Sequence, residues 1–173
     1  MIYTTQRSPL LQLLVGFIAI FLIATDAHSE RDWAGFVDYV VDGDTLHIRP
    51  IRGGAELKVR LEAMDAPESC QAWGPQARQA LAQRVLHHTV QVQSRARDKY
   101  GRLLARVSVN GNDVGAWMVA QGHAWAYGRG KKSASYNEEE ATARAQGRGL
   151  FASRFAERPS NFRRRHGSCY PGH

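Results

Sequence analysis

The sequence has no visible internal repeat, and its acidic residues are scarce relative to the basic ones. Its 173 residues leave room for one domain with a hydrophobic core and not for two. The 16 aspartates and glutamates are outnumbered by 23 lysines and arginines, which gives a formal net charge of +7. That excess suits a polyanionic partner, either a nucleic acid or an anionic membrane surface.

The sequence also lacks a hydrophobic run of full membrane-spanning length. The longest run, Leu10 to Ala24, falls short of the roughly 20 residues that a spanning helix needs. Arg7 precedes it, and Thr25-Asp26-Ala27 fits a small-x-small cleavage site. We therefore expect residues 1–27 to be a removed signal peptide and the protein to be secreted or periplasmic. The alternative is an uncleaved membrane anchor with the protein facing outward.

Cysteine is rare, because Cys70 and Cys169 are the only two. In an oxidising compartment such a pair favours a disulfide. The bond would tie the C-terminal segment to the residues just after Glu68 and would stabilise the fold by roughly 3–5 kcal/mol on the chain-entropy model. Two free thiols are the alternative.

Alternation of apolar and polar residues predicts three consecutive antiparallel strands in the first half of the domain. Asp42-Gly43-Asp44 would form a tight turn between the first two, and Gly43 can take a positive φ that lets both carboxylates point the same way. Arg52-Gly53-Gly54 would form the next turn. These strands are expected over residues 37–41, 45–48 and 56–62.

The second half predicts further strands interleaved with helices. Five short strands with helices after the third and the fifth are compatible with an OB-fold barrel, although the pattern alone does not separate it from other α+β folds. From Glu157 onward the chain is basic, and we expect it to be loosely ordered. Helices are expected over residues 73–87, 113–121 and 135–146, strands over 89–93 and 103–109, and a loop over 95–102.

Acidic residues lie on both sides of the third predicted strand: Asp42 and Asp44 precede it, and Asp65 and Glu68 follow it. Carboxylates gathered at one mouth of a sheet would repel one another, so a cation should offset their charge. A hard divalent ion bound by carboxylate and carbonyl oxygens is the usual solution.

Three blocks in register resemble the staphylococcal (thermonuclease-type) nuclease family over roughly residues 35–152. The resemblance implies an α+β fold that is mainly a β-barrel, namely a five-stranded OB-fold barrel with about three helices over residues 28–156, followed by a basic tail over 157–173. It also implies a Ca²⁺-dependent nuclease that cleaves DNA and RNA and leaves 3′-phosphate products. The blocks are Asp42-Gly43-Asp44-Thr45 with Arg60, Asp65-Ala66-Pro67-Glu68, and Asp98-Lys99-Tyr100-Gly101-Arg102.

Carried over residue by residue, the resemblance makes Asp44, Asp65 and the backbone carbonyl of Ala66 the metal ligands. Asp42 would tune the charge of the site without ligating the ion. The family has threonine where this chain has Ala66, a departure that a carbonyl ligand tolerates.

The same resemblance gives Glu68 the role of general base toward a metal-positioned water. Arg60 and Arg102 would stabilise the charge that develops on the phosphorus.

Lys99 and Tyr100 would bind a neighbouring phosphate, and Trp125 and Tyr127 are candidates for stacking on a base. We expect a monomer. A catalytically silent OB-fold module that binds nucleic acid or protein is the alternative function, but such a module would have no need of the complete charged set.

Overall fold

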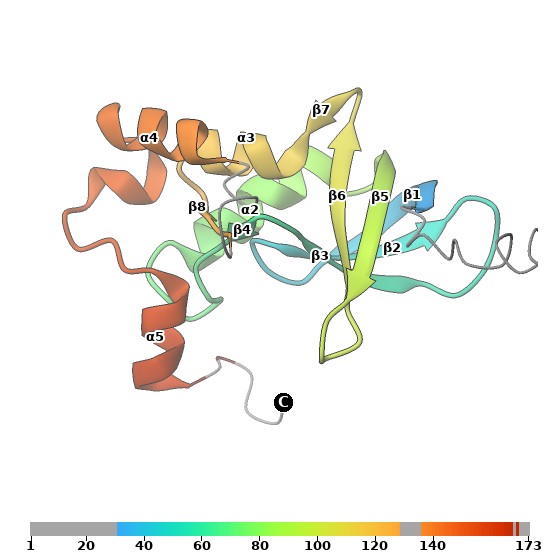
Figure 1. The fold of residues 1–173 in the computed structure, drawn as a ribbon, viewed down its shortest axis with the longest axis horizontal. Helices are drawn as coiled ribbons and strands as arrows, with labels where there is room; N and C mark the ends of the chain where they lie inside the picture. The colour runs from blue at the N-terminus through green and yellow to red at the C-terminus, as the bar shows by residue number, and fades with distance from the viewer. Residues whose placement is uncertain (1–30, 129–135, 168, 170–173) are drawn as a thin grey trace, which may run out of the picture.

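A computed structural model describes residues 31–128, 136–167 and 169; the strands of a closed β-barrel lie on the right in Figure 1, and helices lie to their left. The predicted signal peptide over residues 1–27 lies outside these ranges. Within them, no helix is both long enough and apolar enough to cross a membrane.

Five strands make the barrel: β1 (Arg31–Val40), β2 (Thr45–Pro50), β3 (Leu57–Leu61), β5 (Thr89–Arg97) and β6 (Leu103–Val109). β1, β2 and β3 pair antiparallel in chain order, and β1 pairs with β5, which pairs with β6. A parallel pairing of β3 with β6 closes the barrel. The predicted α+β fold with a five-stranded OB-fold barrel is therefore confirmed.

The barrel is filled by every second side chain of its strands, as the pleat requires. These inward residues are apolar and almost fully buried, and Leu81 and Met118 from two helices pack against them. The inward set is Val37, Leu46, Ile48, Val59, Leu61, Val90, Val92, Ala105 and Val107.

Helices α2 (Gly74–Val85), α3 (Val114–Ala120) and α4 (Asn137–Ala145) correspond to the three predicted helices. Pro75 occupies the first turn of α2, where its missing N–H costs nothing. Asp113 caps α3 by accepting a hydrogen bond from the Ala116 N–H at 3.0 Å. Shorter elements complete the fold: β4 (Met64–Asp65), β7 (Asn112–Asp113), β8 (Trp125–Ala126) and the 3₁₀ helix η1 (Gly149–Ala152).

Three elements differ from the sequence-based expectation. β1 begins at Arg31, before the predicted start at Val37, because residues 31–36 pair with β5. β5 continues to Arg97, past the predicted end at Gln93, because a bulge between Ser94 and Ala96 carries its pairing with β6 onward. The segment expected to be loosely ordered contains a helix, α5 (Pro159–His166). It ends just before Cys169, whose disulfide with Cys70 is present in the structure and confirms the predicted pairing.

His123 lies between two tryptophans at the end of α3. Its Nδ1 accepts a hydrogen bond from Trp73 Nε1 at 3.2 Å, and its ring lies 5.9 Å from that of Trp117. Burial lowers the pKa of His123. Folding therefore favours the neutral form of the His123 imidazole over the charged form.

This environment predicts a pH-dependent stability. Because the pKa of His123 is lower in the folded state, the unfolded chain binds more protons around pH 6, and protonation favours unfolding. The contribution should be fully present above the unfolded pKa of about 6.5 and lost as the pH falls. Urea denaturation between about pH 5 and pH 7.5 measures it. His123→Phe keeps the aromatic packing and should lose that part of the pH dependence; an unchanged slope in the variant would contradict the assignment.

Candidate active site

The turn between β1 and β2 fixes the first carboxylate. The Asp44 backbone N–H donates to Asp42 Oδ1 at 3.0 Å, and the Thr45 hydroxyl donates to Asp44 Oδ1 at 2.9 Å. The other carboxylate oxygen of Asp44 accepts the Ala66 N–H at 3.1 Å, across 22 residues of sequence. Asp44, only 4% exposed, is thereby held against the segment that carries Asp65 and Glu68.

Gly43 is needed in this turn for space. It does not belong to the glycines with positive φ, so the expectation of a left-handed backbone there is wrong. A Cβ at this position would lie 2.7 Å from the Ala66 Cβ and 2.9 Å from the Ala77 Cβ. The glycine thus lets the turn pack closely against both the β4 segment and α2.

Arg60 joins the two buried carboxylates. It lies on β3 opposite Thr45, and its guanidinium pairs with Asp44 through Nη1 and with Asp65 Oδ1 through Nη2 at 2.9 Å. Burial by itself would lower the pKa of Arg60, but the charges of Asp44 and Asp65 outweigh it and raise that pKa. The guanidinium is therefore a permanent cation between two acids.

The pairing with Arg60 also makes the pKa values of Asp42 and Asp44, the two aspartates of the turn, differ from each other. Burial would raise the pKa of Asp44, but the charge and hydrogen bond of Arg60 hold it below its ordinary value. Burial, followed by repulsion from Asp44, raises the pKa of Asp42 to about 7. Near neutral pH, Asp44 is ionised while Asp42 carries only part of its charge, which suits the supporting role predicted for Asp42.

Glu68, the predicted general base, follows β4 and the buried Pro67. Its backbone N–H donates to Gln71 Oε1 at 3.1 Å, which fixes the turn after it. Its Oε1 accepts a hydrogen bond from Arg163 Nη1 at 2.6 Å, and Arg163 Nη2 lies 3.2 Å from Asp65 Oδ2. A second arginine, from α5, therefore bridges the base and a predicted metal ligand.

Sequence reasoning missed Arg163, because the segment after Glu157 was expected to be loosely ordered. A signal for it was present. The predicted disulfide joins Cys70, two residues after Glu68, to Cys169, six residues after Arg163. Any ordered chain leading to Cys169 must pass close to Glu68.

The turn between β5 and β6 carries the other predicted phosphate contacts. Arg102 Nε donates to Asp98 Oδ2 at 2.8 Å, and the Lys99 ammonium and the Arg102 guanidinium lie 4.9 and 5.5 Å from the centre of the Tyr100 ring. Tyr100 is 63% exposed. The parallel pairing of Leu104 with Arg60 puts this turn next to β3, although within the described chain Arg102 pairs with Asp98 and not with the acids around Arg60.

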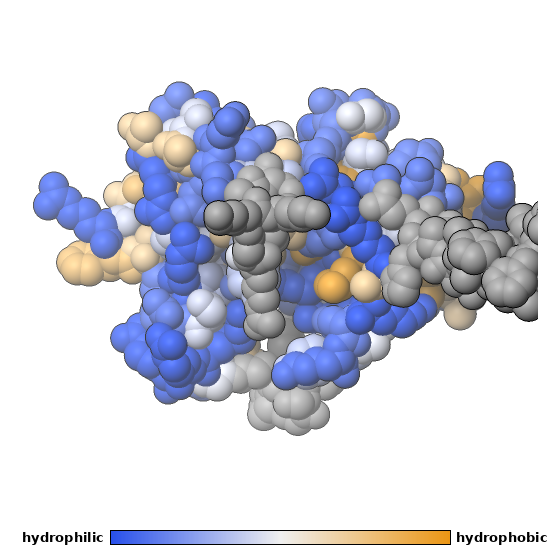
Figure 2. Space-filling model, viewed as in Figure 1, coloured by the Kyte–Doolittle hydropathy of each residue, from blue (hydrophilic) through white to orange (hydrophobic). Residues whose placement is uncertain are grey.

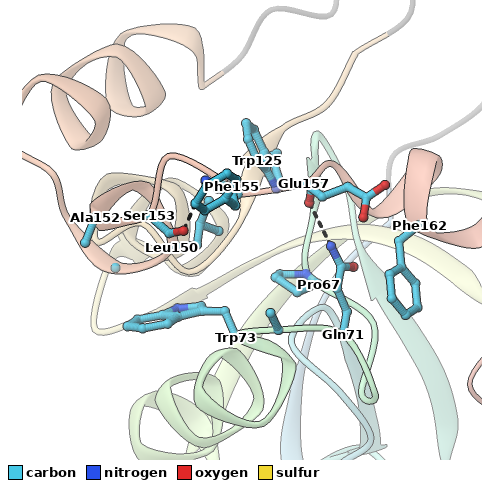
Figure 3. A pocket seen from close by; sticks show the side chains of 13 residues that line it. Pro67, Gln71, Trp73, Trp125, Leu150, Ala152, Ser153, Phe155, Glu157 and Phe162 are labelled. Carbon is cyan, nitrogen blue, oxygen red and sulfur yellow. Dashed lines mark hydrogen bonds between the residues drawn. The ribbon is translucent and has the colours of Figure 1, made fainter.

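The two predicted base-stacking residues differ in exposure. Tyr127 is 43% exposed, whereas Trp125 is 4% exposed. Trp125 packs edge-on against Phe151 and under the guanidinium of Arg144, and it lines a pocket of about 440 Å³ beside Pro67 (Figure 3). The Tyr127 ring is therefore accessible from the surface, as the predicted stacking requires, whereas the buried Trp125 offers no open ring face in this conformation.

The donor set suits a hard cation that keeps part of its hydration. Within the described residues no cluster of three or more histidines, cysteines, aspartates and glutamates is arranged to hold a metal. Two buried carboxylates, on Asp44 and Asp65, nevertheless converge on one guanidinium, and the Ala66 backbone is hydrogen-bonded to the first of them. Ca²⁺ accepts carboxylate, carbonyl and water oxygens together, so Asp44, Asp65 and the Ala66 carbonyl fit it.

Comparison with known proteins identifies the family. A model of the staphylococcal nuclease homologue family matches residues 58–153. The chain belongs to this family. An uncharacterized endonuclease of Haemophilus influenzae is 34% identical over 152 residues, which are 88% of this chain and 84% of that protein. A micrococcal nuclease of Shigella flexneri is 35% identical over 171 residues, covering 92% of this chain and 96% of that protein.

Membership in the staphylococcal nuclease homologue family makes the protein a nuclease, a hydrolase of phosphodiester bonds. The matched region begins on β3 at Lys58 and ends just after η1. It includes Arg60, Asp65, Glu68 and Arg102. It excludes the turn between β1 and β2, with Asp42 and Asp44, and it also excludes α5, with Arg163.

The packing at Gly43 predicts that Gly43→Ala destabilises the protein. The added methyl group overlaps Ala66 and Ala77, and such overpacking costs about 1–3 kcal/mol. Urea denaturation measures the loss. In Gly101→Ala the new Cβ meets nothing within 4 Å, so only the strain of a positive φ remains. A Gly43→Ala protein as stable as the wild type would show that the turn can move away from the site.

The buried ion pairs predict that Arg60→Met is strongly destabilising in Ca²⁺-free buffer. It removes the guanidinium that pairs with the buried Asp44 and one of the two that pair with Asp65, and breaking such a buried pair costs about 3–5 kcal/mol. The matched control is Arg49→Met, because Arg49 pairs with Asp38 at an exposed position and such pairs contribute about 1 kcal/mol or less. Equal losses of unfolding free energy in the two variants would contradict the bridging role of Arg60.

Proposed function

We propose that the protein is an exported, Ca²⁺-dependent nuclease that hydrolyses the phosphodiester bonds of both DNA and RNA and leaves 3′-phosphate products. The observation that carries this proposal is the convergence of Asp44 and Asp65 on Arg60, with Glu68 three residues after Asp65. Oxygen ligands, a fixed cation and a candidate base thus come together within one small region.

Asp44, Asp65 and the Ala66 carbonyl would hold the ion. Bound there, Ca²⁺ would neutralise phosphate charge and make a nearby water easier to deprotonate. Asp44 is prepared for this role, because its carboxylate is ionised and fixed by the Thr45 hydroxyl and the Ala66 N–H. A ligand that is already oriented loses little conformational entropy on binding.

Glu68 would take the proton of the attacking water. The oxygen of that water would bond to phosphorus as the bond from phosphorus to the 5′ oxygen breaks, and the departing 5′ oxygen would take a proton from solvent, so the products are a 3′-phosphate and a 5′-hydroxyl. Pro67 and the hydrogen bond from the Glu68 N–H to Gln71 restrict the backbone that aims this carboxylate. A carboxylate can act as the base when a nearby metal ion acidifies the water.

Arg60 and Arg102 would stabilise the five-coordinate phosphorus. Arg60 is preorganised by its two buried aspartates, and preorganised donors stabilise developing charge most effectively. Arg102, on the exposed turn with Lys99 and Tyr100, would exchange its bond with Asp98 for one with phosphate. Lys99 and Tyr100 would bind the neighbouring phosphate, and Tyr127 would stack on a base.

The charge and the N-terminal segment support the remaining parts of the proposal. A net charge of +7 favours a polyanionic substrate, and binding through phosphates should weaken steeply with salt. The predicted signal peptide over residues 1–27 supports a secreted or periplasmic location, with the membrane-anchored form as the alternative. The Cys70–Cys169 disulfide fits an oxidising compartment.

The proposal predicts that cleavage of single- and double-stranded DNA and of RNA requires Ca²⁺ and stops when a chelator is added. Glu68→Gln should lower kcat by roughly 100-fold or more, because it removes the proton acceptor. Arg102→Lys should lower kcat on the order of 100-fold, because lysine lacks the planar fork. The matched controls are Glu56→Gln and Arg49→Lys, which change an exposed acid and an exposed arginine.

Binding of the oligonucleotides without cleavage in Ca²⁺ or Mg²⁺ would contradict this proposal. The catalytically silent OB-fold module would then be the better description. N-terminal sequencing of the exported protein tests the location separately: a start near His28 supports the cleaved signal peptide.

A further inference from the structure

Helix α5 is fastened to the segment that carries Glu68. The Cys70–Cys169 disulfide joins residues 99 positions apart, with their Cα atoms at 5.7 Å. Gln71 Nε2 donates to the Glu157 carbonyl at 2.7 Å, so the chain entering α5 lies against the residues that follow Glu68 (Figure 3). In the space-filling view of Figure 2, the surface over α5, at the lower left, is hydrophilic.

One arginine of this helix reaches the site. Arg163 Nη1 lies 2.6 Å from Glu68 Oε1, and Arg163 Nη2 lies 3.2 Å from Asp65 Oδ2. The two arginines that follow it pair elsewhere: Arg164 donates to Asn161 at 2.8 Å, and Arg165 pairs with Glu157. The orientation of α5 therefore selects Arg163 alone from this basic run.

Arg163 and Arg60 both pair with Asp65, but their side chains differ in exposure to solvent. The Arg60 side chain is 16% exposed and is fixed between two buried carboxylates, whereas the Arg163 side chain is 40% exposed and comes from outside the barrel. A more exposed guanidinium loses less when it returns to water. Arg163 is therefore the partner that can leave, and Arg60 is the one that stays.

We propose that Arg163 competes with Ca²⁺ for the same carboxylates. The Arg163 guanidinium occupies Asp65 and Glu68 until the metal displaces it. A guanidinium and a calcium ion are attracted to the same carboxylate oxygens, and an acid that is already paired gains less from a second cation. The disulfide strengthens this competition, because it holds α5 against the site. The inference rests on the proposed function, since it takes Asp65 as a Ca²⁺ ligand.

Calorimetric titration of Ca²⁺ into the metal-free protein, without nucleic acid, tests this competition. Arg163→Gln should bind Ca²⁺ about tenfold more tightly or better, which corresponds to the loss of one competing ion pair. Arg164→Gln removes the adjacent charge without touching the site and should bind as the wild type does. The Cys70→Ser/Cys169→Ser double variant should also bind more tightly, because its α5 is no longer fastened.

Thermal denaturation gives a second readout. Without Ca²⁺, Arg163→Gln should have a lower Tm than the wild type, because Glu68 and Asp65 lose a counter-charge. It should also gain more Tm than the wild type at one fixed Ca²⁺ concentration, because a tighter ligand stabilises more. If Arg163→Gln does not fold, Arg163→Lys and the double cysteine variant are tested in its place. Both variants weaken the contact of residue 163 with Glu68 and Asp65.

The outcomes separate this inference from the proposed function. A wild-type protein that binds Ca²⁺ and cleaves DNA, with Arg163→Gln binding the ion no more tightly, would overturn the competition and leave the nuclease proposal standing. Absence of Ca²⁺ binding in every variant would overturn the Ca²⁺ site itself, and the competition with it. Equal tightening in Arg163→Gln and Arg164→Gln would also overturn it, because net charge alone would then explain the effect.

Discussion

The bridge from Arg60 to Asp44 and Asp65 is the interaction on which the site depends. It joins β3, the turn before β2 and the β4 segment, and it places three charges in a buried position where none would be stable alone. The barrel pairing brings Arg60 opposite Thr45, and Gly43 leaves room for the turn to approach. A preorganised guanidinium and two fixed carboxylates are the consequence, and the proposed nuclease mechanism depends on them.

Helix α5, near the C-terminus, adds a second arginine to the site. α5 lies outside the residues that the family model matches, yet the disulfide and the Gln71 bond bring it to the edge of the site. The carboxylates of Asp65 and Glu68 thus have a counter-charge supplied by the chain itself. A site rich in acidic residues is stabilised in this way before any ion or substrate arrives, and the stabilisation opposes metal binding.

Local rules predicted most of the barrel, because alternation, turn residues and the Asp113 cap act within a few residues of sequence. The charged residues of the site were predicted from their spacing and their resemblance to a family. The contacts that were missed are long-range: the packing around Gly43, the burial of Trp125 and the reach of Arg163 are set by elements far apart in the chain. The predicted disulfide was the one sequence feature that pointed to the last of these.

The measurement that tests the central claim most directly is a crystal structure of the protein with Ca²⁺ and a non-hydrolysable oligonucleotide. The account predicts an ion at about 2.3–2.6 Å from carboxylate oxygens of Asp44 and Asp65 and from the Ala66 carbonyl. Arg60 would contact the phosphate, and a water would lie between that phosphate and Glu68. An ion bound elsewhere, with the oligonucleotide remote from these two aspartates, would contradict the assignment of the active site.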